Sequence, residues 1–140
     1  MRKVSVLVGF LLLVGLVLTL VAQEQDLPPI MKENAATMAS LRMHLDAKSA
    51  ADVAKDAAKL QMLFTQAAGI FKAMKAKSAV GLAKAQAERA GAIATAANSN
   101  NLDAAAEPAG AMQKACKGCH DIHREQLPDK TFKFKAAPEP

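Results

Sequence analysis

Apolar side chains recur at helical spacing in four successive segments of this 140-residue chain, and this pattern limits its fold more than any other feature. Residues three, four and seven apart share one face of a helix, so each segment predicts an amphipathic helix. No strand is predicted, and the joining segments are short. The pattern predicts an all-α fold, an antiparallel four-helix bundle. Its helices are expected at about residues 30–45, 50–75, 78–97 and 103–126.

Turn and capping residues separate the four segments. Pro28 and Pro29 mark the start of the first helix, because proline is tolerated in a first turn. Ser49 and Ser78 are the predicted N-caps of the second and third helices. The asparagine-rich run 98–101 predicts a turn. Because up and down helices alternate, the start of the first helix and the end of the fourth are expected at the same end of the bundle.

Residues 1–22 are interpreted as an export segment. Arg2 and Lys3 precede a long uncharged apolar stretch, as in a secretory signal. This stretch is nearly long enough to span a bilayer, which takes about 20 residues. A signal peptide cleaved after Ala22 is the first prediction, and an uncleaved membrane anchor is the alternative. The domain 23–140 is then expected in the periplasm or otherwise outside the cytoplasm, with membrane contact only through an uncleaved anchor.

The charge of the chain is only mildly basic. There are 18 basic and 13 acidic residues, giving a formal charge of +5 at pH 7. Loss of the export segment would reduce the positive charge, because that segment carries two basic residues and no acidic one. The sequence also has no basic stripe with interleaved aromatic residues. A nucleic-acid partner is therefore not expected.

The two cysteines of the chain lie in the sequence "ACKGCHD" near the end of the fourth predicted helix. Cys116 and Cys119 are three residues apart and His120 follows directly, so a helix would present all three on one face. Cys-x-x-Cys-His is the attachment signature of c-type haem: the thiols add across the vinyl groups and the imidazole binds iron. One covalent haem c with His120 as proximal ligand is predicted. A dithiol redox site and a metal site stay as alternatives.

The iron position opposite His120 decides what such a haem can do. A methionine thioether there gives an electron carrier, whereas an open position allows gas binding. Met112 lies on the same predicted helix as His120 and cannot reach the far face. The first predicted helix carries Met31 and Met38 on its apolar face, and both are candidates.

The segments "IMKENAATM" and "CKGCHDIHRE" resemble the class II c-type cytochromes, which are cytochrome c′ and its low-spin, methionine-ligated relatives. The resemblance covers residues 27–127, with the CxxCH on the last helix, and the preceding export segment agrees with it. It implies that Met31 is the distal iron ligand. It also implies that Met38 packs against the haem and that Arg124 lies near the haem edge.

The combined prediction is a monohaem cytochrome, not an enzyme, which transfers single electrons outside the cytoplasm. Redox proteins are the expected partners, and the basic residues around the motif would favour an acidic one: Lys114, Lys117, Arg124 and Lys130. A five-coordinate protein that binds nitric oxide or carbon monoxide is the alternative, as is a thiol redox module. A homodimer is left open. After the last helix, one or two phenylalanines are expected to anchor an otherwise flexible tail.

Overall fold

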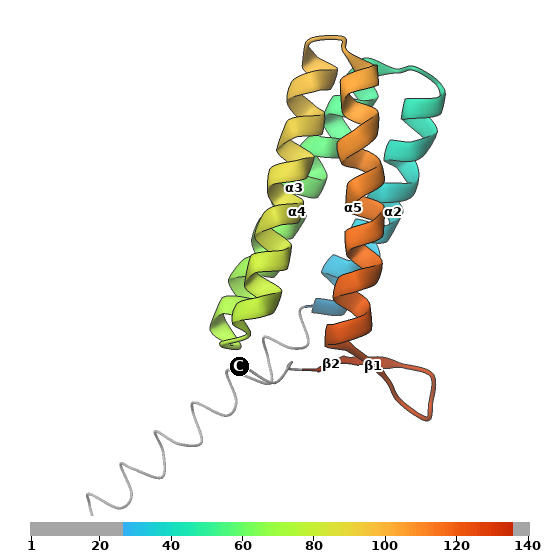
Figure 1. Cartoon of the computed structure of the whole chain (residues 1–140). Coiled ribbons are helices and arrows are strands. Elements are labelled where there is room, and N and C mark those ends of the chain that lie inside the picture. Colours follow the sequence, from blue (N-terminus) through green and yellow to red (C-terminus); the bar gives the residue numbers. More distant parts are fainter. Residues whose placement is uncertain (1–26, 136–140) are drawn as a thin grey trace, which may run out of the picture.

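Four helices form an antiparallel bundle in the computed structural model, which describes residues 27–135 (Figure 1). The prediction of an all-α four-helix bundle is confirmed. The first and last helices begin and end at the same end of the bundle, as expected from their alternation (Figure 1). The helices are α2 (Leu27–Asp46), α3 (Ala50–Ala73), α4 (Lys77–Asn98) and α5 (Leu102–His123).

The described residues say nothing about the predicted export segment, because residues 1–22 lie outside them. Residues 136–140 of the predicted tail also lie outside. Within residues 27–135, no helix combines the length and the apolar character needed to cross a membrane.

Apolar stripes from all four helices meet in the core. The largest fully buried side chains are 1% exposed or less, and burying each one stabilises the fold by about 1.5–3 kcal/mol: Leu41, Val53, Leu60, Ile93 and Met112. The pair α3 and α4 makes the most extensive contacts, whereas α2 and α5 touch only sparsely. Buried alanines on α3 and α4, such as Ala57 and Ala90, explain this close approach.

The turns between helices follow the predicted positions, although the capping differs. Asn101 caps α5 by accepting a hydrogen bond from the backbone N–H of Ala104 at 3.1 Å. Ser49 is the N-cap of α3, but its hydroxyl donates to Asp52 at 2.6 Å and accepts no hydrogen bond from the backbone N–H groups of the first turn. The predicted cap Ser78 is wrong, because α4 begins at Lys77 and Ala76 occupies the N-cap position.

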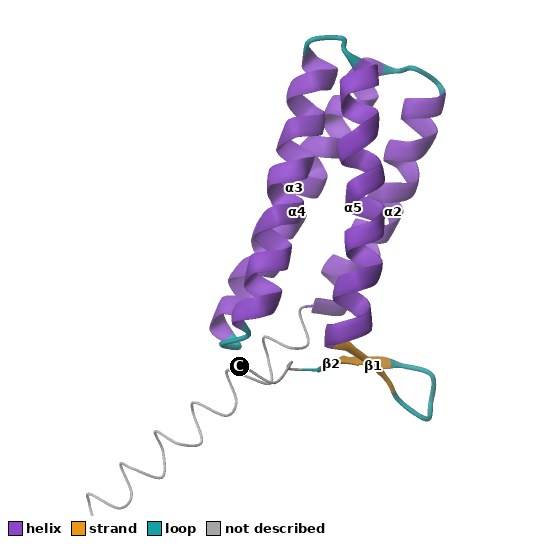
Figure 2. Ribbon diagram, viewed as in Figure 1, coloured by secondary structure: helices purple, strands orange, loops and turns teal. Residues whose placement is uncertain are grey.

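A small β-hairpin follows α5, where the sequence predicted continued helix to about residue 126 (Figure 2). Its antiparallel strands are β1 (Arg124–Gln126) and β2 (Phe132–Phe134), and Lys130 in the turn has φ 67°. A strand of three residues alternates too briefly to be recognised from sequence. The hairpin is therefore a feature that the sequence analysis missed.

The hairpin is anchored to the bundle through Phe134 and His123. The Phe134 ring lies 5.2 Å from the Phe71 ring and stacks on His123 at 5.4 Å. His123 is only 4% exposed, and its ring contacts the Ser78 hydroxyl and the Lys135 carbonyl, each at 3.1 Å. The hairpin thus closes the end of the bundle at which α5 ends.

Candidate functional site

The predicted haem-attachment residues lie in the last two turns of α5. Cys116, Cys119 and His120 are each partly buried, and all three line one cavity. The two cysteines are free thiols. Helical spacing explains the shared face, because positions i, i+3 and i+4 project to the same side.

Two adjacent cavities meet at His120 and Met31. The first, which we call the deep cavity, has a volume of about 340 Å³ and is lined by residues of all four helices. The second, the end cavity, has a volume of about 620 Å³ and lies against the hairpin. Both volumes fall in the range of about 300–1,000 Å³ typical of small-molecule sites. Four residues line both cavities: Met31, Ala35, Phe71 and His120.

The structure brings all of the predicted site residues to these cavities. Met31 lines both, Met38 lines the deep cavity, and Arg124 lines the end cavity. Met31 and His120 come from α2 and α5, whose start and end meet at one end of the bundle. Residues almost 90 positions apart in sequence, and predicted as iron ligands, therefore face a common space.

The electrostatic environment of the thiols does not suit a reactive dithiol. Burial raises the pKa of Cys116, against a smaller lowering effect of its hydrogen bond with Gln86. Burial also raises the pKa of Cys119, and the neighbouring Cys116 raises it further. Reactive cysteines have lowered pKa values, at helix N-termini or beside cations, whereas these lie near a helix C-terminus. Burial and the position near a helix C-terminus therefore do not favour a reactive dithiol here.

The environment of His120 favours a neutral imidazole. Burial lowers its pKa, the cation of Arg124 lowers it further, and Asp121 opposes this with a raising effect. A histidine must be unprotonated to bind a metal ion. The fold therefore keeps His120 in the form that a proximal iron ligand needs.

A buried amide next to Cys116 was not found from the sequence. Gln86 on α4 is 4% exposed, and its Nε2 donates to the Met112 carbonyl at 2.9 Å and to the Cys116 sulfur at 3.2 Å. Arg89 donates to the Gln86 side-chain oxygen at 3.0 Å. The sequence did carry a signal for Gln86, because it is an amide residue within the alanine-rich apolar stripe of α4. Gln86 fixes the position of α5 and of Cys116 relative to α4.

The end cavity has a basic wall with no acidic residue in its lining. Lys32 from α2, Arg124 from β1 and Lys133 from β2 all line it. Arg124 also lies over the Phe132 ring, 4.2 Å from its centroid. Haem carries two carboxylates, and cations of this kind pair with carboxylates. The sequence singled out Arg124 but missed Lys32 and Lys133, since the hairpin was not predicted.

The deep cavity also contains a buried polar side chain without a hydrogen-bond partner within residues 27–135. Asn34 lines this cavity and is 5% exposed, yet neither polar atom of its side chain has a hydrogen-bond partner among the described residues. Buried polar groups are almost always paired in native proteins. The unpaired amide and apolar walls of the deep cavity, beside the basic lining of the end cavity, fit a large, flat, mostly apolar cofactor with polar substituents, which is the chemistry of haem.

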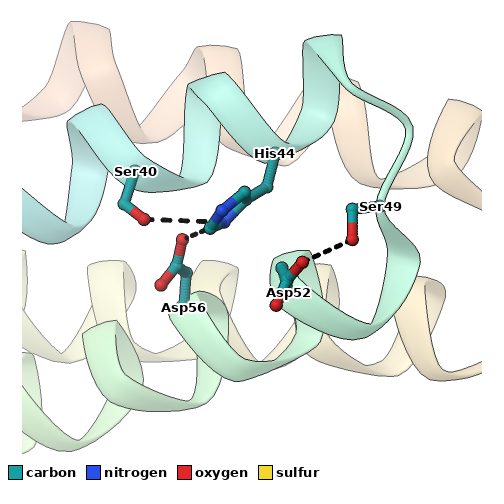
Figure 3. Close-up of polar contacts among 5 residues, drawn as sticks. All are labelled: Ser40, His44, Ser49, Asp52 and Asp56. Atoms are coloured by element: carbon teal, nitrogen blue, oxygen red, sulfur yellow. Dashed lines mark hydrogen bonds and ion pairs between the residues drawn. The ribbon is translucent and has the colours of Figure 1, made fainter.

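A second polar cluster lies away from these cavities, between α2 and α3 (Figure 3). His44 Nδ1 is 2.8 Å from Asp56 Oδ2 and 3.5 Å from the Ser40 hydroxyl. In a catalytic serine triad, the serine and the aspartate bind different ring nitrogens. Here both contact the same nitrogen, so the cluster links two helices and does not form a triad.

Among residues 27–135, no three or more histidine, cysteine, aspartate or glutamate side chains group as they would around a metal ion. Comparison with known proteins gives no match, whether to a protein-family model, to a curated protein or to a solved structure.

Proposed function

We propose that this chain is a monohaem cytochrome of the class II c type that transfers single electrons outside the cytoplasm and is not an enzyme. One observation carries the proposal: the CxxCH residues and Met31 line a single cavity in the core of a four-helix bundle. Four-helix bundles commonly build cofactor sites in their cores from side chains on facing helices.

Each residue of the site has a role in this proposal. Cys116 and Cys119 would hold haem through thioether bonds, and His120 would bind the iron. Met31 would be the distal ligand and Met38 an apolar contact in the deep cavity. Haem, when bound, supplies an iron atom that alternates between the ferric and ferrous states.

The remaining walls would control access to the site. Phe64, Phe71 and Leu82 line the deep cavity with apolar surface, which would exclude water from a bound haem. The basic residues that line the end cavity, including Arg124, would pair with the haem carboxylates. They would also face a redox partner at this end. Because positive potential steers association with negative surfaces, an acidic redox protein is the partner we expect.

The test is the visible absorption spectrum of the purified holoprotein in both oxidation states, for wild type, Met31→Ala and the matched control Met38→Ala. We expect a low-spin wild type with the weak red charge-transfer band of ferric methionine ligation. Only Met31→Ala should lose the band and become high-spin. A wild type that is already high-spin would overturn the Met31 assignment, and failure to bind haem covalently would overturn the cytochrome.

Gas binding is the second candidate, and the small side chains beside Met31 favour it. Ala35 and Ala39 both line the deep cavity, and their small side chains would leave room for a diatomic ligand. A protein of this kind would bind carbon monoxide rapidly when reduced, because no ligand has to leave first. Slow binding, limited by release of Met31, would favour electron transfer instead.

A further inference from the structure

The unpaired amide of Asn34 is the strongest unexplained feature of the described residues. Its residue exposure is 5%, and both Nδ2 and Oδ1 lack a hydrogen-bond partner there. Leaving a buried donor and acceptor unpaired is costly, and such groups in native structures commonly serve a bound group or a functional site.

Asn34 lies between Met31 and Met38 on α2. It lies three residues after Met31 and four before Met38, and all three line the deep cavity. Side chains at these spacings are neighbours on a helix surface, about 5–6 Å apart at their Cβ atoms. The nearby polar side chain of Gln86 is already bonded to the Met112 carbonyl and to Arg89. Asn34 therefore lies between the two methionines on one face of α2, beside the deep cavity.

We propose that the Asn34 amide N–H donates a hydrogen bond to the Met31 sulfur when that sulfur is an iron ligand, and that this bond raises the reduction potential. The inference rests on the proposed function. A thioether sulfur is a weak acceptor. Hydrogen bonds to ligand atoms tune the electron density that the ligand gives to the metal. Withdrawing density from the sulfur disfavours ferric iron more than ferrous iron, so Asn34 acts as a positioning residue through Met31.

Met31 is the acceptor because of its place in the fold. It lines both cavities together with His120, whereas Met38 lines only the deep cavity and lies two turns further along α2. A hydrogen bond to Met31 would also fix the rotamer that carries the sulfur toward the cavity.

The experiment measures the reduction potential and the ferric charge-transfer band of the holoprotein. Asn34→Leu removes the donor at similar volume, Asn34→Ala is a second donor-free variant, and Asn34→Gln retains the amide. Thr37→Val is the matched control, because Thr37 is equally buried on α2 and its hydroxyl already donates to the Glu33 carbonyl at 2.8 Å.

We expect Asn34→Leu and Asn34→Ala to lower the equilibrium constant for reduction about threefold to tenfold, or roughly 30–60 mV, and to move the band. Asn34→Gln should recover part of the shift, and Thr37→Val should leave both readouts at the wild-type values. Donor-free variants with an unchanged potential and an unmoved band would overturn the inference.

Met31→Ala separates this inference from the proposed function. If Met31→Ala abolishes the band while the donor-free Asn34 variants change nothing, only the Asn34 inference fails. If Met31→Ala leaves the band in place, the ligand assignment fails and the Asn34 inference fails with it.

Discussion

Replacing Phe134 by alanine should release the hairpin from the bundle. Phe134 is the contact that joins β2 to the helices, through rings at 5.2 Å from Phe71 and 5.4 Å from His123. An aromatic pair contributes about 0.5–1.5 kcal/mol beyond its buried area, and a fully buried Phe→Ala change costs about 3–5 kcal/mol. Because Phe134 is only partly buried, we expect Phe134→Ala to cost about 2 kcal/mol.

Phe132→Ala is the matched control on the same strand. Phe132 is 48% exposed, and its ring lies against the Arg124 guanidinium. An exposed cation–π contact is worth about 0.5–1 kcal/mol. Phe132→Ala should therefore cost clearly less than Phe134→Ala.

Native-state hydrogen exchange is the assay for this comparison, because it reports local opening as well as global unfolding. The Lys135 amide donates to the His123 carbonyl at 2.8 Å and reports whether the hairpin is docked. Its exchange should accelerate strongly in Phe134→Ala and little in Phe132→Ala. Equal acceleration in the two variants would refute the idea that Phe134 anchors the hairpin.

Three further predictions concern single positions. Because burial lowers the pKa of His120, the unfolded chain binds more protons. The haem-free chain should therefore lose stability as pH falls below about 6.5, the ordinary histidine pKa. Denaturant titrations at several pH values should show a flatter dependence in His120→Gln. Burial raises the pKa of both Cys116 and Cys119, so iodoacetamide at pH 7 should alkylate the haem-free protein more slowly than a cysteine peptide; faster alkylation would favour the dithiol alternative. An added Cβ at Gly81 meets nothing within 4 Å, so Gly81→Ala should raise the unfolding free energy by about 0.5–1 kcal/mol, and a loss of stability would contradict this.

The helices could be predicted from the sequence because their stability comes from regular apolar stripes. The predicted segments 50–75 and 78–97 match α3 and α4 to within about two residues. The fold of residues 124–134 could not be predicted in this way. It depends on contacts of Phe134 with Phe71 and His123, and these residues are distant in sequence or lie on another element.

The candidate site was predictable where a motif or a helical register carries it. The motif identified the CxxCH residues, the helical register left Met31 and Met38 as candidates, and the structure places all of them at the deep cavity. Asn34 was not identified, because an amide on an apolar stripe has meaning only once its lack of partners is known. Lys133 was missed for a different reason, since its place in the end cavity depends on the hairpin.

The unequal packing within the bundle has a consequence for the order in which the chain assembles. The extensive α3–α4 interface joins helices separated by a short turn. In contrast, α2 and α5 are the first and last helices of the described residues, so any contact between them joins residues far apart in sequence. Contacts between residues close in sequence generally form faster than distant ones. We expect α3 and α4 to pair first and to serve as a template for the outer helices. Cys116, Cys119 and Met31 belong to the outer helices, so they would stay accessible until the final stage of folding.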